Sequence, residues 1–195
     1  MARIGKGWWR GILWTGLLLG LYFLTRLTNL TQLPIFTDEA IYIRWAQIGS
    51  QDANWRFISL TDGKQPLFTW LAMVAIRLFP DPLFAGRFVS VVAGSITLVG
   101  VWLLAKEVFQ KPRIAYLASL LYILSPFTTV YDRMALYDSL VATFFVWNLY
   151  LAILLVRRVR LDIALILGMA LGLGMLNKTS GFLSLYLLPA TLLLF

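Results

Sequence analysis

Long apolar runs alternate with short polar segments along most of this 195-residue chain. An α-helix needs about 20 apolar residues to cross a hydrocarbon core of about 30 Å, and six runs approach that length. We expect membrane-spanning helices over Trp8–Leu27, Leu83–Ala105, Ile114–Val130, Leu140–Val156, Ile163–Leu176 and Phe182–Phe195. The pattern therefore predicts an all-α polytopic membrane protein with about six transmembrane helices, the last of them cut off within an apolar run.

Composition supports a membrane protein. The chain is 60% hydrophobic and 13% charged, with a mean hydropathy of +0.79, values that are unusual for a water-soluble domain of this size. Its net charge is +8, and nine of its 17 basic residues lie in three groups before or between apolar runs, as in cytoplasmic loops. These groups are Arg3, Lys6 and Arg10; Lys106, Lys111 and Arg113; and Arg157, Arg158 and Arg160. We therefore expect a cytoplasmic amino terminus and no nucleic-acid partner.

The longest polar segment follows the first span, and we expect it to form a loop on the outer face of the membrane. Within it, Thr37 is expected to cap a helix running to about Gly49, and a second helix is expected over Leu67–Phe79, behind Pro66. A helix of that second length rises only about 20 Å, so both helices would lie along the membrane interface. The predicted division is a first span at 1–27, an outer loop at 28–82 and further spans at 83–195. Because no small-residue cleavage site follows the first span, we interpret it as an uncleaved signal anchor.

Acidic residues are concentrated on the expected outer side. Seven of the nine lie there, namely Asp38, Glu39, Asp52, Asp62, Asp81, Asp132 and Asp138. Ionisable groups near hydrocarbon are costly and usually serve a function. The pair Asp38 and Glu39 is the first catalytic candidate, with Asp38 as a base that takes a proton from a hydroxyl or an amine. The alternative is that both acids only stabilise the start of a surface helix.

Three cations on the outer side are candidate ligands of a phosphate. Lys64 precedes the second interfacial helix, Lys178 lies in the polar break 177–181, and Arg133 follows the third span. The alternative for both lysines is ordinary snorkelling or attraction to anionic headgroups, and Arg133 could pair with a neighbouring acid. Asp138 would either support the outer site or cap the next helix.

The chain contains no cysteine and no histidine. Disulfides, imidazole bases and zinc sites built on these residues are therefore excluded. We expect no cofactor and no metal site, and a divalent metal bound by carboxylates is the one metal chemistry left open.

Five short motifs follow one another in a recognisable order. They are Thr37-Asp38-Glu39-Ala40, Lys64-Gln65-Pro66-Leu67, Arg87, the segment from Arg133 to Asp138, and the segment from Gly172 to Lys178. This order resembles the amino-terminal half of the GT-C polyprenyl-phosphate-sugar glycosyltransferases, in the group of protein mannosyltransferases and aminoarabinose transferases. The resemblance implies a first outer loop above a cavity and inverting transfer from a polyprenyl-phosphate-linked sugar.

By the same resemblance, Asp38 looks like the catalytic carboxylate, with Glu39 beside it. Lys64 and Lys178 look like ligands of the donor phosphate, and Asp138 looks like a second outer acid. Relatives of this kind continue for further spans.

The expected function is transfer of a sugar from a polyprenyl phosphate to a protein, lipid or glycan acceptor. The enzyme would be integral to a prokaryotic plasma membrane, with its active site on the outer face and membrane lipids as neighbours. One alternative is a non-catalytic carrier or lipid-phosphate-binding membrane protein that uses the same lysines. The other is an inactive fragment whose outer acids only keep its loops hydrated.

Overall fold

The structure is a computed structural model that describes residues 6–192, and every regular element among these residues is helical. The α-helices are α1 (Lys6–Leu27), α2 (Thr37–Gln51), α3 (Leu67–Leu78), α4 (Pro82–Phe109), α5 (Pro112–Leu124), α6 (Pro126–Tyr131), α7 (Asp138–Arg158), α8 (Leu161–Asn177) and α9 (Phe182–Leu192). The short 3-10 helices are η1 (Ala53–Trp55), η2 (Ile58–Asp62) and η3 (Thr179–Gly181). The predicted all-α class is therefore confirmed for the described residues.

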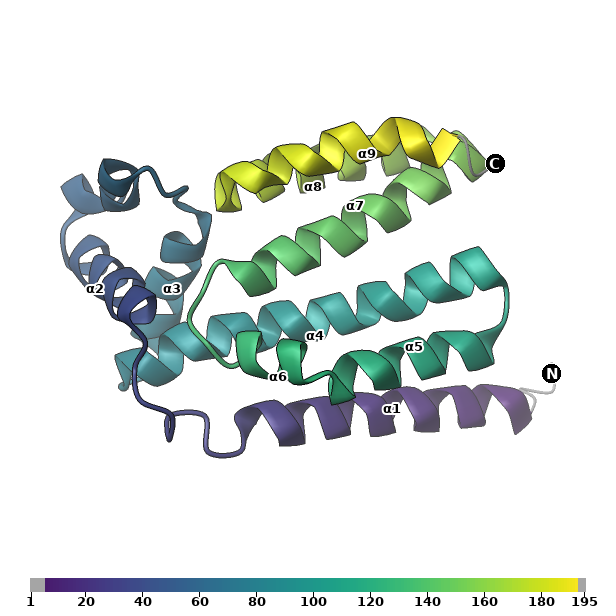
Figure 1. The fold of residues 1–195 in the computed structure, drawn as a ribbon, viewed down its shortest axis with the longest axis horizontal. Coiled ribbons are helices and arrows are strands. Elements are labelled where there is room, and N and C mark those ends of the chain that lie inside the picture. Colours follow the sequence, from purple (N-terminus) through teal and green to yellow (C-terminus); the bar gives the residue numbers. More distant parts are fainter. Residues whose placement is uncertain (1–5, 193–195) are drawn as a thin grey trace, which may run out of the picture.

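The long helices lie side by side along the length of the molecule, and each runs back along the one before it (Figure 1). The order is α1, α4, α5, α7, α8 and α9, while α2 and α3 lie across one end of this bundle. Helix α4 packs against both α5 and α7, and α7 packs against α8. The fold therefore has a bundle of long helices and a smaller layer at one end.

Two helices in the described part of the chain are long and apolar enough to cross a membrane, α4 with 28 residues and α7 with 21. At 1.5 Å per residue they extend about 42 Å and about 32 Å, which covers a hydrocarbon core of about 30 Å. The other apolar helices are shorter. The two central spans are thus supported by length and composition, whereas the six-span layout and the interfacial placement of α2 and α3 stay predictions.

Proline positions decide where several helices begin. Pro82, Pro112 and Pro126 occupy the first turn of α4, α5 and α6, where a missing N–H costs nothing. The expectation of one helix over 114–130 is wrong, because the chain breaks between α5 and α6. Ser125 adopts an extended backbone there, as a residue before proline prefers, and Pro126 starts a new short helix.

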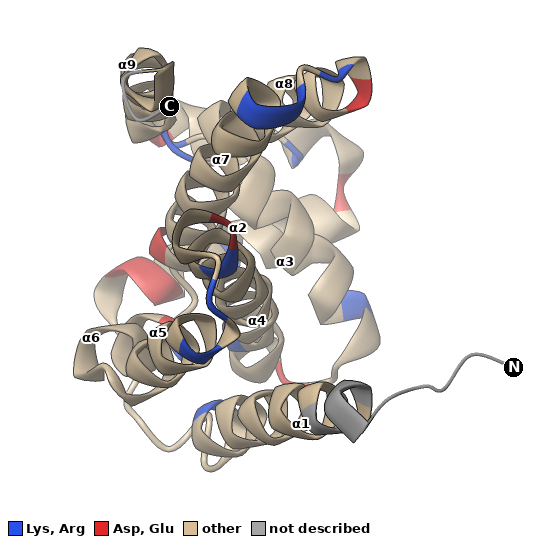
Figure 2. Ribbon diagram, turned by 90° about the vertical axis from the view of Figure 1, so that its right-hand side faces the viewer, with Lys and Arg blue, Asp and Glu red and all other residues tan. Residues whose placement is uncertain are grey.

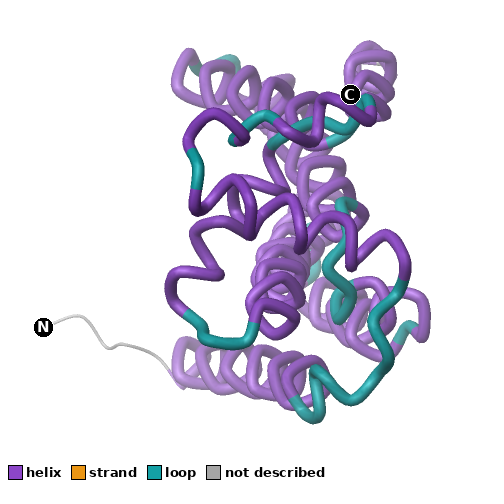
Figure 3. The backbone as a smooth tube through the Cα atoms, turned by 90° about the vertical axis from the view of Figure 1, so that its left-hand side faces the viewer, coloured by secondary structure: helices purple, strands orange, loops and turns teal. Residues whose placement is uncertain are grey.

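Basic groups gather at one end of the bundle. The turn between α4 and α5 carries Lys106, Lys111 and Arg113, and the turn between α7 and α8 lies at the same end, which faces the viewer in Figure 2. Arg157 Nη1 lies 2.8 Å from Glu107 Oε1 and joins these two turns. The opposite end, which faces the viewer in Figure 3, carries α2, α3 and the turn between α8 and α9. Which of the two ends faces the cytoplasm stays a prediction.

The layer formed by α2 and α3 is held to the bundle by an apolar core. Tyr42, Phe68 and Tyr137 pack together in it, with ring centroids of Tyr42 and Tyr137 4.6 Å apart. The hydroxyl groups of Tyr137 and Thr69 form a hydrogen bond, with 3.1 Å between their oxygens. These contacts fix the position of α2 and α3 relative to the first turn of α7.

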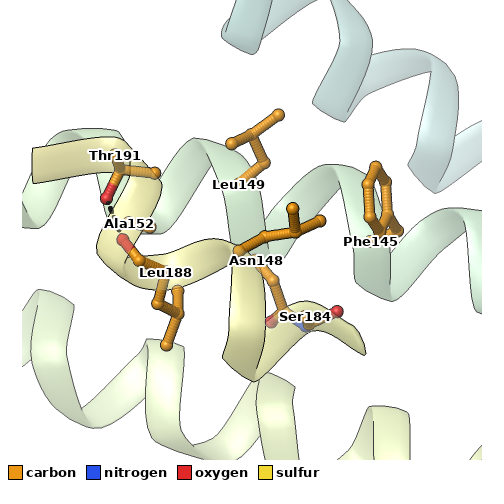
Figure 4. A pocket seen from close by; sticks show the side chains of 8 residues that line it. Phe145, Asn148, Leu149, Ala152, Ser184, Leu188 and Thr191 are labelled. Carbon is orange, nitrogen blue, oxygen red and sulfur yellow. Dashed lines mark hydrogen bonds between the residues drawn. The ribbon is translucent and has the colours of Figure 1, made fainter. Parts of the chain in front are cut away.

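A small cavity between α7 and α9 does not qualify as a substrate site. Figure 4 shows Phe145, Asn148 and Leu149 of α7 beside Ser184 and Leu188 of α9. The cavity measures about 10 Å³, which is roughly the space of one water molecule.

Candidate active site

A cavity of about 310 Å³ opens between the α2–α3 layer and the turn that joins α8 to α9. Its volume lies in the range of small-molecule sites. Four parts of the chain contribute its lining: Asp38 and Tyr42; Gly63, Lys64 and Gln65; Tyr137 and Asp138; and Asn177, Lys178, Thr179 and Ser180. Four of the six candidate residues, Asp38, Lys64, Asp138 and Lys178, therefore line one cavity although up to 140 positions separate them in the sequence.

Asp38 lies in the first turn of α2, and its side chain is exposed. The expected cap at Thr37 is wrong: Phe36 is the N-cap residue, and Thr37 is the first residue of the helix. Tyr42 lies one turn after Asp38 on the same face and borders the same cavity. Burial, and then the negative charge of Asp38, raises the pKa of Tyr42 to about 12, so the phenol stays protonated.

Lys64 reaches the cavity because the chain turns sharply at Gly63. Gly63 ends η2 with a φ of 68°, in the left-handed region where a glycine meets no steric cost from a Cβ. Its N–H donates to Leu60 O at 3.0 Å, and the N–H of Lys64 donates to Ser59 O at 3.0 Å. Lys64 is exposed and forms no ion pair with any residue in the described range 6–192. Its ammonium is therefore open to an anionic ligand.

The predicted break between the last two apolar runs is confirmed, since α8 ends at Asn177 and α9 begins at Phe182. Asn177 is fully buried, and its Nδ2 donates to Tyr137 O at 3.1 Å. Lys178 follows and places its Nζ 3.0 Å from Asp138 Oδ1. Both partners of this pair are almost half exposed, so the pair contributes little stability. It does bring an ammonium and a carboxylate to one wall of the cavity.

Glu39 does not reach the cavity. Its side chain is fully buried, and it holds Arg87 through two hydrogen bonds, Nε to Oε1 at 2.9 Å and Nη2 to Oε2 at 2.8 Å. It also accepts from the N–H groups of Ala135 at 2.7 Å and Phe36 at 3.0 Å. Burial acts to raise the pKa of Glu39, but the bonds from Arg87 and these two N–H groups outweigh it and hold that pKa below its usual value.

Arg133 also lies outside the cavity. Its guanidinium donates to Thr25 O at 3.3 Å, Thr28 O at 2.8 Å and Asn29 O at 2.9 Å. It thereby joins the segment before α7 to the end of α1. The structure thus separates Arg133 and Glu39 from the four residues that share the cavity, and in this geometry both serve to hold segments together.

Several residues of the cavity were not among the sequence candidates. Tyr42, Gln65, Tyr137, Asn177 and Ser180 are the clearest of these. Four of them stand within two residues of a candidate, and Tyr42 stands four residues after Asp38, one helical turn away. Spacing from known candidates was therefore a usable signal for all five.

Two acidic side chains of the cavity, Asp38 and Asp138, are the groups there that could bind a divalent cation. Among residues 6–192, no three acidic side chains gather as metal ligands do. Asp38 and Asp138 line the same cavity, but Lys178 is already paired with Asp138. The donor set fits an anionic ligand better than a cation.

The fold and the site define a helical membrane protein with a polar cavity that is lined by two lysines and two aspartates. Comparison with protein families agrees: residues 63–195 match the family described as dolichyl-phosphate-mannose-protein mannosyltransferase. The chain belongs to this family.

Curated relatives extend the similarity to the residues before 63. The chain is 32% identical over 190 residues to an undecaprenyl phosphate-alpha-4-amino-4-deoxy-L-arabinose arabinosyl transferase of Pseudomonas aeruginosa (strain UCBPP-PA14), covering 90% of this chain and 33% of the relative. It is 30% identical over 190 residues to such a transferase, numbered 2, of Pseudomonas fluorescens (strain Pf0-1), covering 91% of this chain and 34% of the relative. The chain therefore spans about a third of the length of these relatives. No solved structure matches it significantly.

Proposed function

We propose that this chain forms the donor-binding part of a membrane glycosyltransferase that uses a polyprenyl-phosphate-linked sugar. The observation that carries the proposal is the shared cavity, where the exposed carboxylate of Asp38 lies with the ammonium groups of Lys64 and Lys178. A glycosyl transfer from a lipid phosphate needs a base for the acceptor and cations for the departing phosphate. Both are present in one site.

The proposed reaction is a single displacement with inversion. An acceptor hydroxyl or amine attacks the anomeric carbon, Asp38 takes its proton, and the bond between that carbon and the phosphate oxygen breaks. The leaving lipid phosphate gains negative charge, which Lys64 and Lys178 stabilise more strongly in the transition state than in the ground state. Asp138 orients Lys178 through their 3.0 Å ion pair. The acceptor is a protein, lipid or glycan at the outer face of the membrane.

An apolar groove supports a lipid-linked donor. It has a volume of about 500 Å³ and is lined by residues of α3, α4, α7 and α8, including Leu67, Leu140 and Phe144. Leu67 lies three residues after Lys64 in the chain, and Leu140 lies two residues after Asp138. A polyprenyl chain in this groove would leave its phosphate near the two lysines.

The test compares Asp38→Asn with Asp62→Asn, which changes an exposed acid outside the cavity. Radiolabelled undecaprenyl-phosphate sugars are supplied to membranes that contain the protein, and transferred label is counted. We expect Asp38→Asn to reduce transfer by about 10²-fold or more, the usual contribution of a general base, and Asp62→Asn to leave it unchanged. Binding of undecaprenyl phosphate should persist in Asp38→Asn and weaken in the double variant Lys64→Gln/Lys178→Gln.

Two outcomes would count against the proposal. If Asp38→Asn transferred sugar at the full rate, the assignment of Asp38 as the base would be wrong. The other outcome is that the unaltered protein transports the lipid but transfers no sugar, while lipid binding still depends on the lysines. That result would identify a non-catalytic carrier.

A further inference from the structure

A second pocket lies in the α2–α3 layer, and its lining residues are all different from those of the active-site cavity. Its volume is about 500 Å³. It is bordered by the end of α2, the segment after η1, and one face of α3, through Gly49, Ser50, Arg56, Phe57, Trp70, Met73, Val74 and Arg77. We call it the Arg56–Arg77 pocket.

One wall of the Arg56–Arg77 pocket is a stripe along α3. Trp70, Val74 and Arg77 follow one another at helical spacing and so share a face. The indole N–H of Trp70 donates to Arg56 O at 2.8 Å, and the ring of Phe57 lies edge-on to Trp70 with centroids 5.3 Å apart. The two sides of the pocket are therefore joined by specific contacts.

The two arginines have no acidic partner. Neither Arg56 nor Arg77 forms an ion pair with any residue between 6 and 192, and the pocket lining contains no carboxylate. Arg77 Nη2 donates to Ser50 O at 3.3 Å, near the end of α2, which uses one of the five N–H groups of its guanidinium. Most of the donors of both arginines remain open to an anion.

Two apolar side chains of the lining are exposed to solvent. The side chain of Val74 is 60% exposed and that of Phe57 is 55% exposed. A free inorganic anion would leave this apolar wall in water, and an uncharged lipid would leave both guanidinium groups unpaired. Arginine binds phosphate through parallel hydrogen bonds, so a phosphate joined to a hydrocarbon chain satisfies both parts of the pocket.

We propose that the Arg56–Arg77 pocket binds the headgroup of an anionic glycerophospholipid. The two guanidinium groups contact its phosphate, and an acyl chain lies against Trp70 and Val74. This lipid is bound and not consumed, so the site is separate from the proposed transfer reaction. Its occupation holds the α2–α3 layer, and with it Asp38, against the bilayer surface.

The test measures lipid binding by the purified protein in an uncharged detergent. Dioleoylphosphatidylglycerol is titrated and bound lipid is counted by native mass spectrometry, with inorganic phosphate as a separate probe. We expect Arg56→Gln/Arg77→Gln to weaken lipid affinity by about tenfold or more, since both charges that hold the phosphate are lost. Val74→Gln keeps both charges and should weaken binding of the lipid while leaving any phosphate binding unchanged.

The matched control is Arg44→Gln/Arg113→Gln, which removes the same charge from two exposed arginines outside the pocket. Equal losses in the control and the pocket variant would show non-specific attraction and overturn the proposal. Unchanged binding in Arg56→Gln/Arg77→Gln would also overturn it. So would inorganic phosphate binding as tightly as the lipid, because the apolar wall would then play no part. Circular dichroism and binding of undecaprenyl phosphate establish that each variant is folded.

Discussion

Glu39→Gln tests whether the buried pair of Glu39 and Arg87 holds the candidate site together. Oε1 of Glu39 accepts from Arg87 Nε and from the N–H of Ala135, and Oε2 accepts from Arg87 Nη2 and from the N–H of Phe36. A glutamine has only one such oxygen. In either orientation its amide nitrogen meets two N–H donors, which leaves those donors unsatisfied in a buried place.

The loss of stability in Glu39→Gln is expected to be large because every N–H group of Arg87 already donates a hydrogen bond. Its five N–H groups donate twice to Glu39 and once each to the carbonyls of Leu30, Leu33 and Pro34, at 2.8 to 3.2 Å. The guanidinium therefore has no free donor with which to find another anion. Removing one partner of a buried ion pair costs about 3–5 kcal/mol, and we expect Glu39→Gln to lower the free energy of unfolding by that amount.

The assay is unfolding in detergent micelles, followed by tryptophan fluorescence as the concentration of a denaturing detergent rises. Glu39→Gln/Arg87→Met should lose less stability than the sum of the two single variants, because no unpaired charge remains. Asp62→Asn, an exposed acid in η2, should change the free energy of unfolding by less than about 0.5 kcal/mol. If Glu39→Gln were as stable as Asp62→Asn, the pair would not stabilise the fold. If the double variant lost as much stability as the two single variants added together, the unpaired charge would not be the cause of the loss.

Two further expectations concern pH and the turn before Lys64. Because the pKa of Glu39 is lowered in the folded protein, the stability it contributes is fully present above the ordinary carboxyl value of about 4.3 and is lost as pH falls below it. An acid titration of unfolding should show this loss in the unaltered protein and not in Glu39→Gln. At Gly63, a valine would have to adopt a φ of 68°, at a cost of about 1–3 kcal/mol, and would displace Lys64. Gly63→Val should bind undecaprenyl phosphate more weakly by titration, with Gly20→Ala, at an open helical position, as the control; equal affinities would contradict the role of the turn.

Much of the helix layout could be predicted from the sequence, because apolar runs and prolines act locally. Hydropathy alone predicted the apolar run that forms α7. The polar break before α9 was predicted from a lysine that stands among apolar residues. The apolar run 114–130 is long enough for one helix, but Pro126 alone is enough to divide it into α5 and α6. The N-cap position of Phe36 was missed because Thr37 is a good cap by residue type, whereas the N–H of Phe36 donates to the side chain of Glu39.

Four of the six candidate site residues were predicted to share a site and do line one cavity, whereas Glu39 and Arg133 do not, for a physical reason. Asp38, Lys64, Asp138 and Lys178 stand in polar segments beside helix ends, where a charge signals exposure. Arg133 has the same local appearance, yet it donates to three carbonyls around the end of α1, more than 100 positions earlier in the sequence. Contacts at that separation depend on how the helices pack, and a single sequence does not show them.

The different roles of Asp38 and Glu39 follow from helix geometry. Successive residues of an α-helix point about 100° apart, so two adjacent carboxylates leave the helix in different directions. Glu39 points toward α4 and holds Arg87, while Asp38 points into the cavity with Tyr42, one turn along. Glu39 thereby fixes the first turn of α2, and that turn fixes the direction of Asp38. The base that we propose is thus held by its own neighbour, and a catalytic side chain needs such rigid surroundings.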